Sequence, residues 1–213
     1  MTIFTNVTIE STDVTFLRSF IDTSWAAAAA GPADITTTNG TGYTQNVTDD
    51  AEGAGAETIE EAAFSFDTSG LETTYGAAME VTAASFKYEI MSQSPSNYGG
   101  IVGYYNHYTS LALSDWVNPP PSETTAFSRL LFSSGVGIQT DALSSISTQI
   151  NTTSVTGIII VSSGISNNVA PANDKDLTIA TDGHATGFVP SLILTIDDHI
   201  IPAAATLWLG TSF

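Results

Sequence analysis

The sequence predicts an all-β protein built as an antiparallel two-sheet sandwich. Three observations favour this class. The 213-residue chain holds many short segments in which apolar and polar side chains alternate, the period of a half-buried strand. Gly, Pro, Asn and Ser bound these segments, as they bound strands in sandwiches. No long amphipathic helix pattern lies between them, so the strands must cover one another.

The stretch 59–90 carries the strongest pattern and predicts a strand, a loop and a second strand. Each arm alternates apolar with polar residues. The apolar positions are Ala62, Phe64 and Phe66 in the first arm and Phe86, Tyr88 and Ile90 in the second. The link contains Gly70 and Gly76, which are free to adopt positive φ. We expect the other strands to lie beside this pair.

The first 33 residues predict two strands, in 2–8 and 13–20, followed by a short helical crossing. Alternation of apolar residues supports both strands, and the alanine run that begins at Trp25 favours the helix. Gly31 and Pro32 end this segment. We treat 1–33 as an N-terminal part and 34–213 as the main β unit, together forming one compact domain.

Residues 34–57 predict a hairpin and then a loop. Asn39-Gly40 is a strong turn signal between candidate strands near Ile35 and in 43–47. The acidic run 49–57, rich in Gly and Ala, is typical of a flexible, solvated loop.

The remaining chain predicts further strands with one short helix. Residues 98–110 form a tyrosine-rich candidate strand, and Ser114 is placed to cap a one-turn helix over 115–117. The other predicted strands are 127–132, 146–151, 157–163, 176–181 and 191–197, with 204–213 as one more edge strand or a tail. In 191–197 the residues Leu192, Leu194 and Ile196 share one face.

The charge balance excludes nucleic acid and anionic membranes as partners. The chain has 22 Asp and Glu against 4 Lys and Arg, a formal net charge of −18, and both kinds of partner need clustered cations. Two explanations of the acidity stay open, a soluble acidic surface and adaptation to high salt. The chain has no cysteine, which excludes disulfides and thiol chemistry. It shows no signal peptide and no apolar run of membrane-spanning length, so we expect synthesis in the cytoplasm.

No pattern of catalytic residues is visible, and we expect no enzymatic activity. A hydrolytic triad needs a histidine near a nucleophile and an acid, and none of His107, His184 and His199 lies in a nucleophile-elbow context. Because lysine and arginine are scarce, the charge stabilisers that a lyase or hydrolase uses on anionic sugars are scarce too.

Calcium is the one metal for which the sequence offers ligands, because carboxylates in loops suit it. Two segments supply them. The candidate ligands are Asp49, Asp50 and Glu52 in the first segment and Asp174 and Asp176 in the second. Neither segment matches an EF-hand loop, and acidic loops in an acidic protein are mostly solvated. No other cofactor is predicted.

Aromatic residues between 98 and 116 predict a candidate glycan-binding row. The residues are Tyr104, Tyr105, Tyr108 and Trp116, and a surface row of such rings is suited to hold sugars. Because side chains alternate along a strand, the competing interpretation places half of them in the core. Both interpretations stay open at this point.

Several strand sequences resemble a jelly-roll module of virion proteins. They are AFSFDTSGL, VTAASFKYEI, ISTQIN, GIIIVSS and VPSLILTI, spread over residues 12–197. They are similar to core strands in structural proteins of tailed bacteriophages and haloarchaeal tailed viruses. Phe86 and Asp197 stand where other residues are commoner in that family. The motifs contain no catalytic residues.

The resemblance implies a jelly-roll on a virion, as a capsid decoration, turret or tail-fibre protein. Its partners would be further copies of itself, other capsid or tail proteins, and glycans of the host surface. A halophilic host would suit the acidity. The alternative is a carbohydrate-binding module or adhesin of a cellular organism. A monomeric state in solution would favour this alternative.

Overall fold

The computed structural model describes eleven strands and two short helices. It describes residues 4–22, 34–37, 44–52, 56–94, 101–106, 112, 129–132, 135–144, 146–162, 175–180 and 187–198. The strands are β1 (Phe4–Asp22), β2 (Asp34–Thr37), β3 (Thr44–Glu52), β4 (Ala56–Asp67), β5 (Glu80–Ser94), β6 (Ile101–Tyr105), β7 (Arg129–Phe132), β8 (Gly137–Ala142), β9 (Val155–Ser162), β10 (Lys175–Ala180) and β11 (Ser191–Asp197). The helices are α2 (Leu71–Tyr75) and α3 (Ile146–Gln149).

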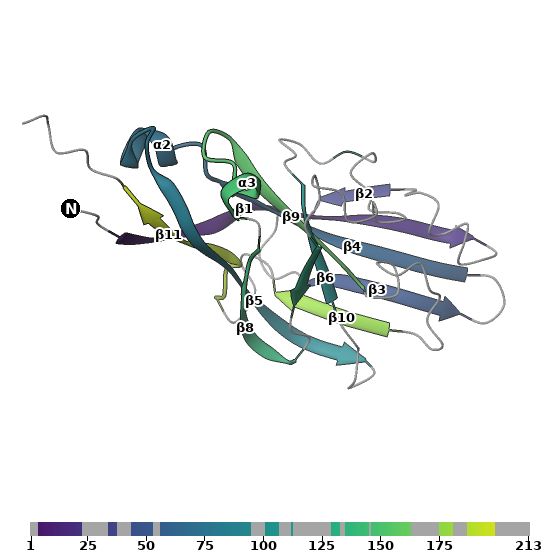
Figure 1. Cartoon of the computed structure of the whole chain (residues 1–213). Helices are drawn as coiled ribbons and strands as arrows, with labels where there is room; N and C mark the ends of the chain where they lie inside the picture. The colour runs from purple at the N-terminus through teal and green to yellow at the C-terminus, as the bar shows by residue number, and fades with distance from the viewer. Residues whose placement is uncertain are drawn as a thin grey trace, which may run out of the picture.

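The strands form one antiparallel sheet that curls back on itself. Neighbours follow the order β2-β1-β11-β5-β10-β3-β4-β9-β6-β7, β1 also pairs with β4, and β8 pairs with β5. The extra β1–β4 pairing returns the sheet to its start, so opposite parts of it enclose a core (Figure 1). This arrangement confirms the predicted all-β antiparallel sandwich. The jelly-roll order of strands stays a prediction.

The first strand takes part in two different ladders. Its first half pairs with β11, from Phe4 opposite Asp197 to Glu10 opposite Ser191. Its second half pairs with β4, after a register shift between Ser11 and Asp13. The structure therefore joins into one strand the two strands predicted in 2–8 and 13–20. The predicted helical crossing at 25–31 lies outside the described residues.

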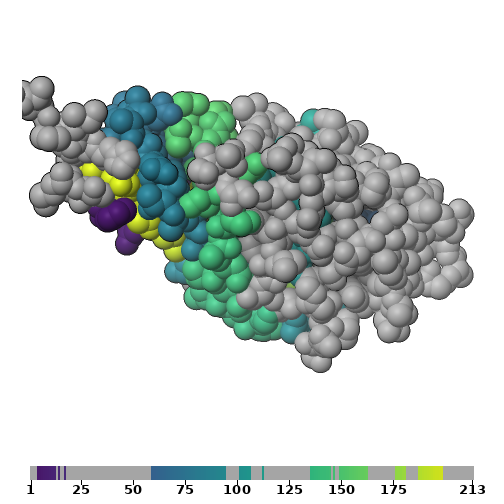
Figure 2. Space-filling model, viewed as in Figure 1, coloured from purple at the N-terminus to yellow at the C-terminus, as the bar shows by residue number. Residues whose placement is uncertain are grey.

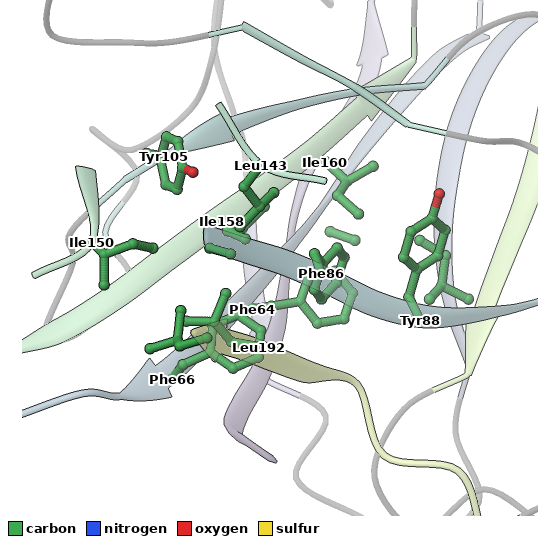
Figure 3. Close-up of a cluster of buried hydrophobic side chains, with 14 of the residues drawn as sticks. Phe64, Phe66, Phe86, Tyr88, Tyr105, Leu143, Ile150, Ile158, Ile160 and Leu192 are labelled. Carbon is green, nitrogen blue, oxygen red and sulfur yellow. The ribbon is translucent and has the colours of Figure 1, made fainter. Parts of the chain in front are cut away.

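The 59–90 stretch forms two strands, but they do not pair with each other. β4 and β5 have different ladder neighbours and meet across the core instead. The Phe64 and Phe86 ring centroids are 5.3 Å apart, and those of Phe66 and Phe86 are 5.8 Å apart in an edge-to-face arrangement. Figure 3 shows these rings packed together with Leu192 of β11. This aromatic group is the centre of the core.

The link between β4 and β5 contains a helix that the sequence did not predict. Residues 71–75 form α2, and its one buried side chain is Leu71. Gly70 precedes the helix at φ −88°, while Gly76 follows it at φ +91°, a conformation that favours glycine. Only the second of these two glycines therefore adopts the positive φ that the sequence allowed.

Burial along the strands follows the predicted alternation in β5 and β11 but not in β4. In β5 the side chains of Phe86, Tyr88 and Ile90 are buried while their neighbours are partly exposed. The predicted inner face of β11 (Leu192, Leu194 and Ile196) is fully buried, which confirms it. In β4 every residue from 59 to 66 is buried, on both faces. Glu60 and Glu61 are among them, so β4 is a central strand rather than a half-buried one.

Two further predictions were wrong, one in strand pairing and one in the type of element, and one strand was missed. β2 and β3 exist near the predicted places, but β2 pairs with β1, and β3 pairs with β10 and β4. The Asn39-Gly40 turn itself lies outside the described residues. Residues 146–149, predicted as a strand, form α3, because Ile146 and Ile150 lie one helical turn apart and both contact the core. β8 was not predicted.

Candidate interaction surface

The two adjacent tyrosines of the predicted glycan-binding row lie in the core. Tyr104 is 2% exposed and Tyr105 is 1% exposed, because all five residues of β6 are buried. The Tyr105 hydroxyl donates a hydrogen bond to the Ser144 carbonyl oxygen at 3.0 Å, and burial raises the pKa of Tyr105 above its usual range. These two rings cannot stack on a sugar, so the prediction was wrong for them. Tyr108 and Trp116 lie outside the described residues.

The first acidic segment is part of a strand rather than a loop. Asp49, Asp50 and Glu52 lie in β3, with backbone partners in β4 opposite each of them. The regular ladder replaces the predicted flexible loop over these positions, since β4 pairs with all three residues and β10 also pairs with Asp49.

The second acidic segment runs beside the first. Asp176 is exposed in β10, and the preceding Lys175 lies opposite Asp49 of β3. Asp174 lies outside the described residues. Within the described part of the chain, no group of three or more His, Asp or Glu residues is placed to hold a metal ion.

A buried chain of hydroxyl groups closes the end of the core near α2. The Thr68 Oγ1 atom lies 2.6 Å from the Ser154 carbonyl oxygen, 2.5 Å from that of Asn151 and 2.9 Å from Thr156 Oγ1. Thr156 Oγ1 in turn accepts the Asn151 N–H at 3.0 Å. This Thr68 hydroxyl cluster ties the end of β4 to the loop before β9, and its role is structural.

The same loop is held to α2 from outside. The Thr152 hydroxyl donates to Glu72 Oε1 at 2.6 Å. The two contacts together fix the 151–156 loop against the β4–α2 junction.

The outward side of β1, β11, β5 and β8 forms a continuous sheet face. We call it the outer face. Its side chains alternate with those that pack on the core, as the ladder registers require. Its members are Phe4, Asn6, Thr8 and Glu10 of β1, Ser191, Ile193, Thr195 and Asp197 of β11, Glu80, Ala83, Ser85, Lys87 and Glu89 of β5, and Ile138, Thr140 and Ala142 of β8.

Small and hydroxyl-bearing side chains are the commonest kind on the outer face, and charged ones are the next. Charged side chains occur at five of its positions, Glu10, Glu80, Lys87, Glu89 and Asp197, of which Asp197 is buried. Lys87 is one of the four basic residues of the chain, and its Nζ atom lies 5.7 Å from the ring centroid of Phe188. The β8 part of the face carries no charge, since its outer residues are Ile138, Thr140 and Ala142, and in this it resembles the centre of a protein–protein interface.

Side-chain hydrogen bonds hold the outer face in register. The Thr195 hydroxyl donates to Asn6 Oδ1 at 3.0 Å, and the Thr82 hydroxyl donates to the Thr195 carbonyl oxygen at 3.2 Å. These bonds join β1, β11 and β5 across the face, so the three strands present one ordered surface.

β8 is part of the outer face, and together with the residue before it this strand exposes apolar side chains. Val136 and Ile138 are each 58% exposed, and with Phe4 they are the large apolar side chains most exposed among the described residues. In Figure 2, β8 lies on the visible surface of the molecule. Among the strands that the structure describes, β8 has one ladder neighbour, β5. Within the described part of the chain, its other edge has no ladder partner, so the backbone groups there can accept a further strand.

A hydrogen bond inside the molecule anchors β8. The Tyr88 hydroxyl donates to Asp141 Oδ2 at 2.6 Å, and the Tyr88 ring stacks on Phe86 at 5.0 Å. Asp141 is the one charged residue of β8, and this bond directs its carboxylate toward β5 rather than toward the open edge.

The sequence contains a weak signal for β8 that was missed. Ile138, Thr140 and Ala142 alternate with Gln139 and Asp141, which is the period of a strand. Only one of the five is strongly apolar, so the pattern does not stand out from a polar loop.

Comparisons with known proteins found no relative of this chain. No helix in the described part of the chain is long and apolar enough to cross a membrane. No protein-family model matches the chain. No curated protein sequence matches it either.

Proposed function

We propose that this chain is a non-enzymatic structural protein of a virion, on a capsid or tail, that assembles as a homo-oligomer. The observation that carries the proposal is the edge of β8 that has no ladder partner among the described strands, beside the exposed apolar side chains of Val136 and Ile138. A chain with a net charge of −18 repels its own copies, so contact between copies needs a surface with few charges. β8 provides such a surface, because its outer-face residues Ile138, Thr140 and Ala142 carry no charge.

The fold and the strand sequences support the viral part of the proposal. The curled antiparallel sandwich is an architecture that assembles symmetrically through its faces and edges. The resemblance of five strand sequences to virion jelly-roll modules supplies the location. Other capsid or tail proteins are then the partners beside further copies of the chain.

Light scattering coupled to size exclusion tests the assembly. The mass is measured in 0.1 M and in 1 M NaCl, because the screening length falls from about 10 Å to about 3 Å between these conditions. We expect a mass that is an integral multiple of the 22.2 kDa protomer. The share of the protein in this oligomer should stay the same or rise in high salt. A folded monomer under both conditions, at protein concentrations up to the millimolar range, would contradict the assembly.

Particle location needs a separate measurement. An antibody raised against the purified chain should label the surface of intact virus particles from producing cells. Labelling confined to cells, with none on purified particles, would contradict a virion protein.

The alternative of a carbohydrate-binding module depended on the aromatic row. Two of its four rings, Tyr104 and Tyr105, are buried, so the structure does not favour this function. A glycan array with wild type, Tyr108→Ala and Trp116→Ala separates the two. A monomer that binds a glycan through Tyr108 and Trp116 would establish the alternative, while an oligomer that loses glycan binding in these variants would add a host-glycan contact to the virion protein.

A further inference from the structure

The backbone groups at the open edge of β8 belong to alternate residues. The Leu143 N–H donates to the Ala84 carbonyl oxygen at 2.9 Å, next to the Ala142–Ser85 pair. In an antiparallel ladder this bond makes Ala142–Ser85 a non-hydrogen-bonded pair. The next pair, Asp141–Phe86, therefore exchanges both of its hydrogen bonds.

It follows that alternate residues of β8 direct their N–H and C=O groups in opposite directions. Those of Gly137, Gln139 and Asp141 are directed at β5. Those of Ile138, Thr140 and Ala142 are directed away from β5, toward the open edge. Ile138, Thr140 and Ala142 therefore expose their side chains on the outer face and direct their backbone N–H and C=O groups toward the edge that has no partner among the described strands.

We propose that the protein self-associates by pairing β8 antiparallel with β8 of a second copy, across a two-fold axis at Thr140. The inference rests on the proposed homo-oligomer and names its contact. A two-fold axis perpendicular to the sheet keeps both outer faces on the same side, so each residue lies opposite one of the same parity. The outer face then continues from one copy into the other.

Placing the axis at Thr140 satisfies every outward group of β8. Ile138 lies opposite Ala142 of the second copy, and Thr140 lies opposite its own equivalent. Each of the three pairs exchanges two hydrogen bonds, which uses all outward N–H and C=O groups of both strands. An axis at Gln139 or at Asp141 leaves one outward residue of each β8 without a partner inside the strand. Thr140 is therefore the favoured centre.

The side chains are compatible with the same register. The outward residues Ile138, Thr140 and Ala142 carry no charge, so no two carboxylates oppose each other. On the core side, Gln139 lies opposite Asp141 of the second copy, an amide donor facing an acceptor. An axis at Asp141 would instead set two Asp141 carboxylates against each other, which is unfavourable.

The contact is small. A six-residue strand spans about 20 Å, and its edge buries less than the roughly 1,200 Å² of a stable standard interface. We therefore expect measurable self-association at high protein concentration and in high salt, where the repulsion between anionic copies is screened. The assembly contains an even number of copies, because the two-fold contact joins them in pairs.

Thr140→Pro tests the contact. Proline removes the N–H of Thr140, which is directed away from β5, so the β5–β8 ladder is retained. We expect the mass in 1 M NaCl to fall to half that of wild type, with self-association at least about tenfold weaker. Thermal unfolding and circular dichroism of the variant report whether the protomer is folded.

Thr140→Cys provides a second test that does not depend on the proline variant. The chain has no cysteine, so an added thiol can react only with that of another copy. Residues in a hydrogen-bonded antiparallel pair have Cα atoms about 5.5 Å apart, which a disulfide can span. Thr73→Cys, exposed on α2, is the matched control. We expect rapid cross-linking of the first variant and slow cross-linking of the second.

Each outcome decides between the two proposals. An oligomer with an odd number of copies, or one unchanged by Thr140→Pro and with no faster cross-linking of Thr140→Cys than of Thr73→Cys, would overturn the β8 contact and leave the homo-oligomer standing. A wild-type chain that stays monomeric would overturn both.

Discussion

Replacing Thr68 with valine tests how much the buried hydroxyl cluster stabilises the fold. Valine has nearly the shape of threonine, so the packing is retained while the Thr68 hydroxyl is lost. The Thr156 hydroxyl then loses an acceptor, and a carbonyl oxygen, of Asn151 or Ser154, loses its donor. Each buried group left unsatisfied costs about 1–3 kcal/mol, so the expected loss is about 2–5 kcal/mol.

Thr68→Ser is the matched control because it keeps the hydroxyl and removes one methyl group. Its expected cost is about 1 kcal/mol. The free energy of unfolding of wild type and both variants is measured by urea denaturation at one fixed salt concentration, followed by circular dichroism. Adding Thr156→Val to each background completes a double-mutant cycle, in which we expect a coupling between positions 68 and 156.

The comparison between the two variants is the deciding result. If Thr68→Val is no more destabilising than Thr68→Ser, the cluster contributes through packing and the hydrogen-bond reasoning is wrong. If the destabilisation of the double variant equals the sum of those of Thr68→Val and Thr156→Val, the two positions are not coupled and that part of the reasoning is wrong as well.

Three other predictions concern the core and its borders. Tyr88→Phe removes the bond to Asp141 and should cost about 1–3 kcal/mol in urea denaturation, whereas an unchanged midpoint would show that this bond adds nothing. Gly76→Ala should cost about 1 kcal/mol of stability because Gly76 has a φ of +91°. Gly70→Ala should be neutral or stabilising, because Gly70 has a φ of −88° and an added Cβ meets open space. Equal effects of the two substitutions would contradict the backbone argument. Because burial raises the pKa of Tyr105, the folded state resists its ionisation, so its contribution is complete below about pH 10 and is lost as the pH rises further. The melting temperature between pH 9 and 12 should therefore fall more steeply in wild type than in Tyr105→Phe.

The strands of the core were predictable because their apolar alternation is strong. Phe64, Phe66, Phe86 and Tyr88 are all buried, and the inner face of β11 is as the sequence indicates. Strand partners were not predictable, because ladder pairing joins segments far apart in the chain. The turn signal at Asn39-Gly40 favoured a local hairpin, yet both flanking strands pair elsewhere.

The ambiguous segments were decided by tertiary contacts. Ile146 and Ile150 fit a helical turn as well as an alternating strand, and the core that both contact selects the helix. The error at Tyr104 and Tyr105 has a related cause. Alternation predicts that one of two adjacent residues is exposed, but β6 is covered on both faces, so both rings are buried.

The candidate surface escaped prediction for a different reason. β8 is an edge strand. Only one of its two faces contacts the core, so its residues need little hydrophobicity. Its importance arises from the direction of its backbone groups, which depends on the register with β5. No property of the residues themselves reports that register.

The pairing of β1 with β11 has a consequence for the order of folding. Phe4 and Asp197 lie about 190 positions apart, whereas Phe64 and Phe86 lie about 20 apart, so closing the outer pair costs about 2 kcal/mol more in chain entropy. During synthesis the contacts of Phe64 and Phe66 with Phe86 can form as soon as residues 59–90 have left the ribosome. The first half of β1 must wait for residue 197. We therefore expect the molecule to fold from its middle outward, with the first half of its earliest-made strand among the last parts to pair.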